Sequence, residues 1–250
     1  MEFRVLGSVE VHEAGRAYRP RAAKLRDVLR LLVFRAGEFV ATDTIMQELW
    51  EDNPPVSSIT TTQTYIYHLR RAFAEELGVP RPEDVLTTRQ AGYLLRADPA
   101  DTDCGRFAAL IGRGRDLAGA GRWAEAAAAL REALALWHEP HARSATVTTL
   151  NAQHLEHYQE LHRAAVELRV TADLRQGRHR ELIPELRALV LRNPLNEWFH
   201  AQLISCLGVS GRRGEALEAY RSARRIIIDE LGLEPSVELQ RVHREMLATG

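Results

Sequence analysis

The spacing of hydrophobic residues changes along the chain, and each change predicts a different kind of element. Over residues 3–19, apolar positions such as Phe3, Val5 and Val9 alternate loosely with polar ones. This pattern is typical of short antiparallel strands. From residue 22 onward, apolar residues recur every three or four positions, which is the period of an amphipathic helix. The spacing predicts helices over residues 22–36, 40–50 (capped by Thr42) and 57–78, followed by a β-hairpin over 85–96.

The segment 57–78 has two faces that differ in chemistry. At about 100° per residue, one side carries a stripe that we expect to be buried: Ile59, Thr62, Ile66, Leu69, Phe73 and Leu77. The opposite side carries hydroxyls, rings and a guanidinium: Thr60, Thr61, Thr64, Tyr67, His68, Arg71 and Glu75. Threonine can contact base edges and arginine can contact phosphates. The segment is therefore either a DNA-recognition helix or an ordinary amphipathic helix with an unusual surface.

Charge in this half of the chain is segregated along the sequence. Residues 16–35 hold seven basic side chains and one acid, whereas residues 38–52 hold five acids and no base. Lys24 and Arg26 fall in the first turn of a helix, where the helix dipole favours acids. This conflict indicates either an external anion such as a phosphate or a solvated basic face. The basic segment favours DNA, and the acidic segment cannot lie along it.

The order of strands, three helices and a hairpin is that of a winged helix-turn-helix, and it resembles the OmpR-type variant. In such a domain the third helix enters the major groove and the hairpin contacts the backbone. We therefore predict base contacts from Thr60, Thr61, Thr64, Tyr67 and His68. We predict phosphate contacts from Lys24, Arg26, Arg70, Arg71 and Arg89.

From Pro99 onward the pattern becomes alanine-rich and helical, so we place a domain boundary between residues 97 and 98. A Gly-Arg phrase with Glu four positions after the Gly recurs at Gly121, Gly177 and Gly211. The last two glycines are 34 residues apart, which is the tetratricopeptide period. The spacing predicts a small helical array over 98–250, with a longer helix over 151–174. The fold class is therefore mainly α, with an N-terminal winged helix.

Composition narrows the class of protein but does not by itself indicate DNA. The 250 residues carry 33 basic and 34 acidic side chains, so DNA binding has to come from local charge. We expect no transmembrane helix and no signal peptide, and hence a cytoplasmic protein. Cys104 and Cys206 are expected to be buried free thiols.

Several kinds of chemistry find no support in the sequence. His154, His157 and His162 share one helical stretch but lack a third set of metal ligands, so we predict no metal site. No dinucleotide fingerprint follows a predicted strand, and no phosphate-binding Gly-Lys-Ser/Thr motif occurs. We expect neither a cofactor nor an enzyme.

The combined motifs resemble the SARP family, the Streptomyces antibiotic regulatory proteins. The matching segments are FRVLG (3–7), KLR (24–26), ELW (48–50), QTYIYHLRR (63–71), GYLL (92–95), AALREALALW (128–137), ALEAY (216–220) and DELGLEP (229–235). The resemblance implies an OmpR-type winged helix followed by a bacterial transcriptional activation domain.

The resemblance also implies a function. Proteins of this family activate biosynthetic gene clusters by binding direct repeats near the promoter −35 region as side-by-side protomers. They recruit RNA polymerase holoenzyme, including sigma factor region 4. On this basis, Glu48, Glu51, Asp52 and Asn53 are expected to contact the polymerase or sigma factor.

A second function of another class stays open. The array could act as a tetratricopeptide sensor or adaptor that binds a peptide or small molecule on its concave face. In that case DNA binding would be secondary and would serve to position the array.

Overall fold

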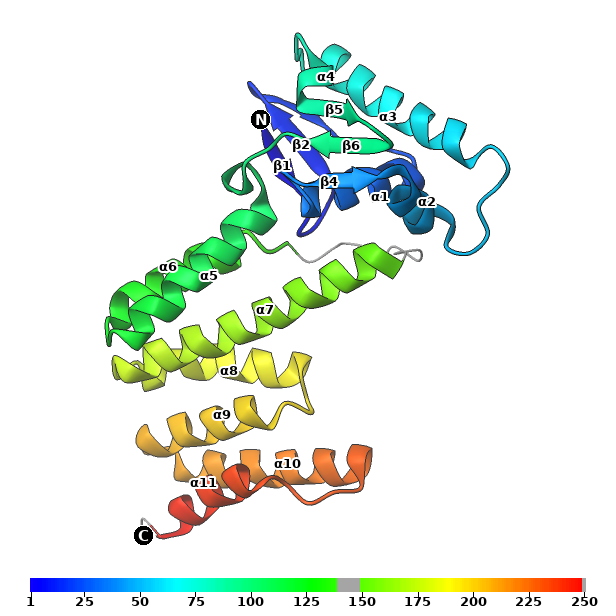
Figure 1. Cartoon of the computed structure of the whole chain (residues 1–250). Coiled ribbons are helices and arrows are strands. Elements are labelled where there is room, and N and C mark those ends of the chain that lie inside the picture. The colour runs from blue at the N-terminus through cyan, green and yellow to red at the C-terminus, as the bar shows by residue number, and fades with distance from the viewer. Residues whose placement is uncertain (139–148, 249–250) are drawn as a thin grey trace. The chain divides into compact units, whose positions relative to one another are not determined.

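The computed structural model describes residues 1–138 and 149–248, and it divides the chain into two compact units (Figure 1). The first unit spans Met1–Arg169 and the second spans Val170–Gly250. Among the described residues, no helix is both long and apolar enough to cross a bilayer. The thiols of Cys104 and Cys206 are free and buried, as the sequence predicted.

The first unit opens with a three-stranded antiparallel sheet, which confirms the strands predicted over 3–19. Its strands are β1 (Glu2–Arg4), β2 (Glu10–Glu13) and β3 (Arg16–Tyr18), in the order β1-β2-β3. Phe3 and Tyr18 each contact the ring of Phe73 edge-on, with ring centroids 6.5 Å apart. These contacts anchor the sheet to the third helix of the unit.

Three helices follow: α1 (Ala23–Phe34), α2 (Thr42–Trp50) and α3 (Ser58–Glu75). The sequence predicted all three but missed the strand β4 (Phe39–Ala41) between the first two. Val40 was predicted to be helical but lies in β4, opposite Tyr93. Thr42 was predicted to cap α2, but Ala41 holds the cap position, and no side chain that the structure describes caps the helix. The partner strand of β4 lies some 50 residues away, so local spacing could not reveal it.

The hairpin predicted over 85–96 is present. It follows a short helix α4 (Pro82–Val85) and consists of β5 (Leu86–Arg89) and β6 (Gly92–Leu95). Together with β4 these strands form a second antiparallel sheet in the order β4-β6-β5. A Cβ atom at Gly92 would lie 2.3 Å from the carbonyl oxygen of Val40, so the close approach of β4 and β6 requires glycine there.

Helices of the C-terminal half pack into the first unit as well. A single 3-10 turn η1 (Pro99–Asp101) leads into α5 (Asp103–Gly119), α6 (Trp123–Ala135) and α7 (Thr149–Arg175). The buried carboxylate of Asp103 accepts hydrogen bonds from the backbone N–H groups of Val5 and Leu6, at 2.8 and 2.9 Å. α5 is thus fastened to the end of β1. The domain boundary at 97/98 stays a prediction.

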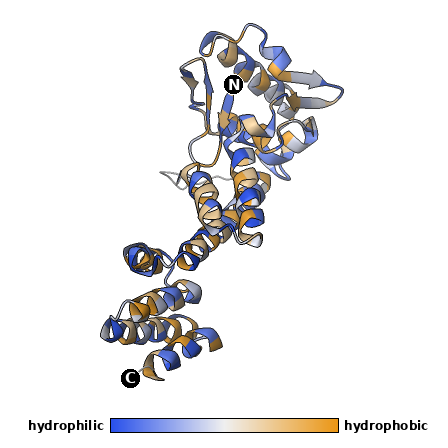
Figure 2. Cartoon of the chain, turned by 90° about the vertical axis from the view of Figure 1, so that its left-hand side faces the viewer, coloured by the Kyte–Doolittle hydropathy of each residue, from blue (hydrophilic) through white to orange (hydrophobic). Residues whose placement is uncertain are grey.

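The second unit is a helical array, as the repeat predicted. Its helices are α8 (His179–Arg192), α9 (Glu197–Val209), α10 (Arg213–Leu231) and α11 (Val237–Ala248). Hydrophobic and hydrophilic residues are interspersed along these helices (Figure 2). Pro194 and Pro235 fall between helices, where the sequence placed boundaries.

The recurring phrase forms a turn before a helix each time. Gly121, Gly177 and Gly211 have φ of 73°, 77° and 79°, a conformation that strains other residues. In two of the three phrases the arginine pairs with the glutamate: Arg122 with Glu125, and Arg212 with Glu215. In the other, Arg178 bonds instead to Asp173.

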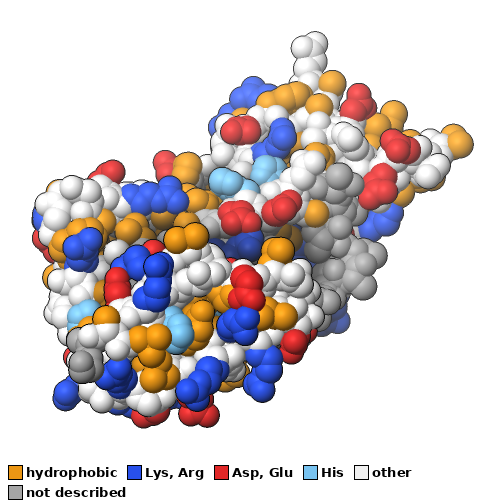
Figure 3. Space-filling model, turned by 90° about the horizontal axis from the view of Figure 1, so that it is seen from below, with side chains coloured by type: hydrophobic (Ala, Val, Ile, Leu, Met, Phe, Trp, Pro, Cys, Tyr) orange, Lys and Arg blue, Asp and Glu red, His pale blue; other side chains and the backbone are white. Residues whose placement is uncertain are grey.

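The surface carries both signs of charge in close mixture. On the face shown in Figure 3, basic, acidic and apolar side chains are interspersed. Any recognition of nucleic acid or peptide must therefore come from local groups of side chains, as the near-zero net charge predicted.

Candidate nucleic-acid interface

The exposed face of α3 carries the polar side chains that the sequence assigned to it. Thr60, Thr64, Tyr67 and His68 are exposed, and Thr61 is half-buried. Gln63 is exposed on the same helix and was missed by the sequence reasoning, although its helical position could have indicated it. Glutamine can donate and accept hydrogen bonds at a base edge. The face therefore holds six side chains with groups that can contact bases.

The opposite side of α3 is buried, with one correction. Thr62, Ile66, Leu69 and Phe73 are inaccessible or nearly so. Ile59 was predicted to be buried but is 55% exposed. The first turn of α3 follows an exposed loop, and no residue within 1–138 and 149–248 covers this flank of the helix. Ser58 occupies the buried position there instead.

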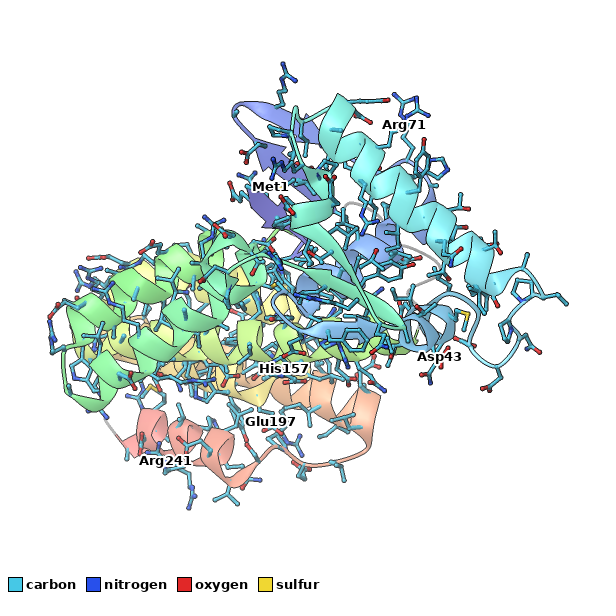
Figure 4. All side chains as sticks on the ribbon, turned by 45° about the horizontal axis from the view of Figure 1, so that its top comes forward. Met1, Asp43, Arg71, His157, Glu197 and Arg241 are labelled. Atoms are coloured by element: carbon cyan, nitrogen blue, oxygen red, sulfur yellow. The ribbon has the colours of Figure 1, made fainter. Side chains whose placement is uncertain are left out.

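Side chains on the exposed face of α3 also contact one another, through two rings and an ion pair. The rings of Tyr67 and His68 meet edge-on with centroids 5.6 Å apart. One turn further along, Arg71 Nε donates to Glu75 Oε1 at 2.9 Å, and this hydrogen bond raises the pKa of the arginine. Arg71 projects outward from α3, away from the strands (Figure 4). Its guanidinium is exposed and can contact a phosphate.

Arg70 differs from Arg71 because its guanidinium contacts the hairpin. Its Nε and Nη2 donate to the carbonyl oxygen of Leu86 at 2.8 and 2.6 Å. Nη2 also donates to Thr88 Oγ1 at 2.8 Å. Leu86 and Thr88 belong to β5, so Arg70 fixes the hairpin against the third helix.

The remaining basic residues predicted for this face differ in how exposed their side chains are and in whether other groups of the protein already hold them. Lys24 Nζ donates to the carbonyl oxygen of Leu49 at 3.0 Å and lies 4.8 Å from the centroid of the Trp50 ring. Arg26 is half-buried and donates to the carbonyl oxygen of Arg21. Arg89 is exposed at the tip of the hairpin. Arg89 is therefore the most accessible, and Lys24 is held close to α2.

The acidic segment divides into exposed and buried parts. Glu51, Asp52 and Asn53 are exposed in the loop between α2 and α3. Glu48 was expected to contact the polymerase, but its side chain is fully buried. Its Oε2 accepts hydrogen bonds from the backbone N–H groups of Leu150 and Asn151 at 3.0 and 3.2 Å. In this arrangement Glu48 cannot reach a partner protein, so its predicted polymerase contact is corrected.

Burial also changes the acid–base behaviour of Glu48. Loss of hydration raises the pKa of its carboxyl to about 7, although the hydrogen bonds from Asn151 and Leu150 favour the charged form. The negative charge of Asp27 contributes to this rise. The group is therefore a structural acceptor that titrates close to neutral pH.

The histidines of α7 pack against aromatic rings. His154 lies 5.1 Å from Phe34, and His162 lies 4.6 Å from Trp137, measured between ring centroids. Burial lowers the pKa of His154 and so favours its neutral form. Within residues 1–138 and 149–248, no group of three or more His, Cys, Asp or Glu side chains could hold a metal ion.

Comparison with protein families places two known domains on this chain. Residues 20–95 match the domain described as "Transcriptional regulatory protein, C terminal". Residues 102–247 match the "Bacterial transcriptional activator domain". The first match covers the three helices and the hairpin, and the second covers the helices from α5 onward.

Individual proteins resemble the chain along nearly its whole length. Regulatory protein DnrI of Streptomyces peucetius is 37% identical, over 99% of this chain and 92% of its own. Transcriptional regulator RedD of Streptomyces coelicolor is 32% identical, over 99% of this chain and 71% of its own. Mycobacterium tuberculosis EmbR, solved in complex with a low-affinity phosphopeptide, superposes with a TM-score of 0.89 at 29% identity. That likeness covers 99% of this chain and 65% of the EmbR chain.

Proposed function

Because the chain belongs to the SARP family, whose members are transcription regulators and not enzymes, we propose that it activates an antibiotic biosynthetic gene cluster. It does so by binding direct repeats near the promoter −35 region as side-by-side protomers. The observation that carries the proposal is the exposed face of α3, held to the hairpin by Arg70. A recognition helix and a hairpin joined in this way can approach a DNA groove and its flanking phosphates as one rigid unit.

In this proposal α3 reads the bases. Thr60, Thr61, Thr64, Tyr67 and His68 contact base edges, and Gln63 joins them because it is exposed on the same helix. The threonines supply a hydroxyl and a methyl group, which suits contact with thymine as well as with polar edges. Specificity then depends on several moderate contacts along one helix.

In this proposal the basic residues contact the phosphate backbone of the DNA. Arg71 and Arg89 are exposed, and each can neutralise a phosphate without breaking a buried contact. Lys24 and Arg26 are half-buried and contact phosphates near the start of α1. Arg70 contributes mainly by positioning the hairpin, because its guanidinium already holds Leu86 and Thr88.

The loop between α2 and α3 is the proposed contact for RNA polymerase holoenzyme, including sigma factor region 4. Glu51, Asp52 and Asn53 are exposed there, and Glu48 is left out because it is buried. The carboxylates of Glu51 and Asp52 would be repelled by DNA but can pair with basic groups of a protein, and the amide of Asn53 can donate and accept hydrogen bonds beside them.

A gel-shift titration tests the DNA-binding part. A promoter duplex with direct repeats is compared with a random duplex of the same length, over a range of salt concentrations. We expect specific binding to be tighter by on the order of 1,000-fold or more. The logarithm of affinity should fall with the logarithm of salt concentration, by about 0.9 for each neutralised phosphate. Equal affinity for both duplexes, or no dependence on salt, would contradict the proposal.

The second candidate function, peptide or small-molecule binding by the helical array, also has an observation in its favour. The unit Val170–Gly250 has an open groove of about 890 Å³, lined by residues of α8, α9 and α10. This volume lies within the range of about 300–1,000 Å³ that is usual for ligand sites.

A further inference from the structure

The groove of the second unit has an apolar floor. Leu203 and Leu207 of α9 are buried beneath it, and Val190 of α8 is partly exposed beside them. At the rim, Leu191 is 82% exposed. An apolar side chain from a partner could cover Leu191 and remove it from water, and burial of apolar surface stabilises a complex.

One of the two acids that line this groove is already neutralised. Glu215 Oε2 accepts a hydrogen bond from Arg187 of α8 at 2.7 Å. The same carboxylate is held by Arg212, through Nε at 2.8 Å and Nη2 at 2.7 Å. A single carboxylate shared by two guanidinium groups leaves a net positive charge at this end of the groove.

Two arginines on α10 have no such partner. Arg221 and Arg225 both line the groove, are exposed, and stand one helical turn apart on the same face. Neither has a hydrogen bond or an ion pair with any residue that the structure describes. Their neighbour Arg224, by contrast, holds Glu234 through Nε at 2.9 Å. The groove therefore offers two unpaired guanidinium groups beside an apolar floor.

We propose that this groove binds an acidic peptide segment of a partner protein, with one apolar side chain of the segment packed on Leu191 and the floor. Carboxylates of the peptide pair with Arg221 and Arg225, since guanidinium groups accept carboxylates in a forked geometry. The inference deepens the second candidate function and does not depend on DNA binding.

The other charged residue of the lining favours a peptide over nucleic acid. Glu218 lies among the lining residues, and its carboxylate would repel a phosphate backbone. A nucleic acid carries a charge at every nucleotide, whereas a peptide can place its carboxylates against Arg221 and Arg225 and an uncharged residue, with a backbone N–H that can donate, beside Glu218. The open form of the groove, between the helices of an array, suits an extended chain.

The test selects peptides of about 12 random residues, displayed on phage, against the intact chain. Selected peptides are then synthesised with a fluorescent label, and their dissociation constants are measured by anisotropy. We expect the selected set to be rich in Asp and Glu and to carry a shared apolar position. The double substitution Arg221→Glu/Arg225→Glu should weaken binding by about tenfold or more, and added salt should weaken binding to the unsubstituted chain.

The control is Arg244→Glu, the same change at an exposed arginine of α11 that does not line the groove. It should leave peptide affinity within about twofold. Circular dichroism of all variants checks that they fold. Selection of basic peptides, failure to enrich any peptide, or equal binding by the double variant would overturn the proposal.

Two further outcomes identify a different occupant. If the double variant changes the sedimentation of the chain alone, the groove binds a second copy of this chain and the proposal fails. If a short DNA duplex displaces the peptide from the groove, Arg221 and Arg225 bind nucleic acid and the proposal fails. Gel shifts with the double variant keep the two functions apart, because its promoter affinity should be unchanged even where peptide binding is lost.

Discussion

The backbone N–H of Asn151 donates to the Glu48 carboxylate at 3.2 Å, although 103 positions of sequence separate the two residues. The Asn151 side chain donates to the same carboxylate and to the carbonyl oxygen of Asp27. Leu150 and Asn151 lie in the first turn of α7, whose N–H groups have no partner within the helix. A residue of α2 therefore caps α7, and the winged helix and the start of α7 are joined by buried hydrogen bonds.

This arrangement predicts a stability that depends on pH. Burial raises the pKa of Glu48 from 4.5 to about 7 in the folded chain. Between these values the folded state keeps a proton that the unfolded state has lost, so stability falls as pH rises from about 4.5 to about 7. The loss amounts to roughly 3 kcal/mol. Glu48→Gln should remove most of this fall, as measured by urea unfolding at about pH 5 and pH 8.

Part of the pH dependence should remain in Glu48→Gln, because burial also raises the pKa of Asp27. Asp52→Asn, at an exposed position in the next loop, is the matched control and should keep the dependence of the unsubstituted chain. If Glu48→Gln and Asp52→Asn showed the same dependence on pH, Glu48 would not be the titrating group.

Substitutions of Arg70 and Arg71 should have different effects, because Arg70 positions the hairpin and Arg71 is proposed to contact a phosphate. Arg70→Ala removes the hydrogen bonds to Leu86 and Thr88 and should lower the free energy of unfolding by about 1–2 kcal/mol. It should also weaken DNA binding, because the hairpin is no longer held. Arg71→Ala should weaken binding to every duplex alike and leave unfolding unchanged, since its side chain is exposed. Equal effects of both changes on unfolding would contradict this assignment.

Thr64 should contribute to base preference. Its hydroxyl already donates to the carbonyl oxygen of Thr60 at 2.8 Å, so its methyl group and oxygen lone pair are what a base can meet. Thr64→Ala should narrow the difference in affinity between operator and altered sequences by about 1 kcal/mol for one base pair. Thr61→Ala should have a smaller effect, because Thr61 is half-buried. Competition gel shifts with single-base operator variants measure both, and a uniform loss across all sequences would rule out base reading.

Asp52→Lys should uncouple DNA binding from activation. Asp52 is exposed in the loop between α2 and α3, away from the buried contacts of Glu48. Reversing its charge should keep promoter affinity but reduce transcription in a reconstituted assay with RNA polymerase. A parallel loss of binding and transcription would mean that the loop lies against DNA.

The repeat turns predict opposite effects for two nearby glycines. Gly211 has φ of 79°, and no described atom lies within 4 Å of the Cβ that alanine would add. Gly211→Ala should therefore cost about 1 kcal/mol through backbone strain alone. Gly214 has ordinary helical backbone in the first turn of α10, so Gly214→Ala should stabilise the array by up to about 1 kcal/mol. Thermal unfolding followed by circular dichroism compares them, and a shift in the same direction for both would refute the argument.

The sequence by itself determined the class of each domain and the order of its main elements, although not the strand β4. Apolar spacing located α1 and α3, and the hairpin residues located β5 and β6. The recurring Gly-Arg phrase marked the turns before α6, α8 and α10. These features depend on residues within a few positions of one another, so the local pattern contains them.

Only the tertiary structure decided which side chains are free to act. Glu48 and Asp52 both belong to one acidic segment, yet Glu48 is buried because Asn151 reaches it from α7. Arg70 and Arg71 are adjacent, yet Arg70 is held by Leu86 of β5. Each of these outcomes depends on a residue distant in sequence. The neighbouring residues in the chain do not indicate that such a side chain will be buried or held. The spacing of apolar and polar residues thus predicts a recognition helix, and the packing around that helix determines which of its charged side chains remain available to DNA.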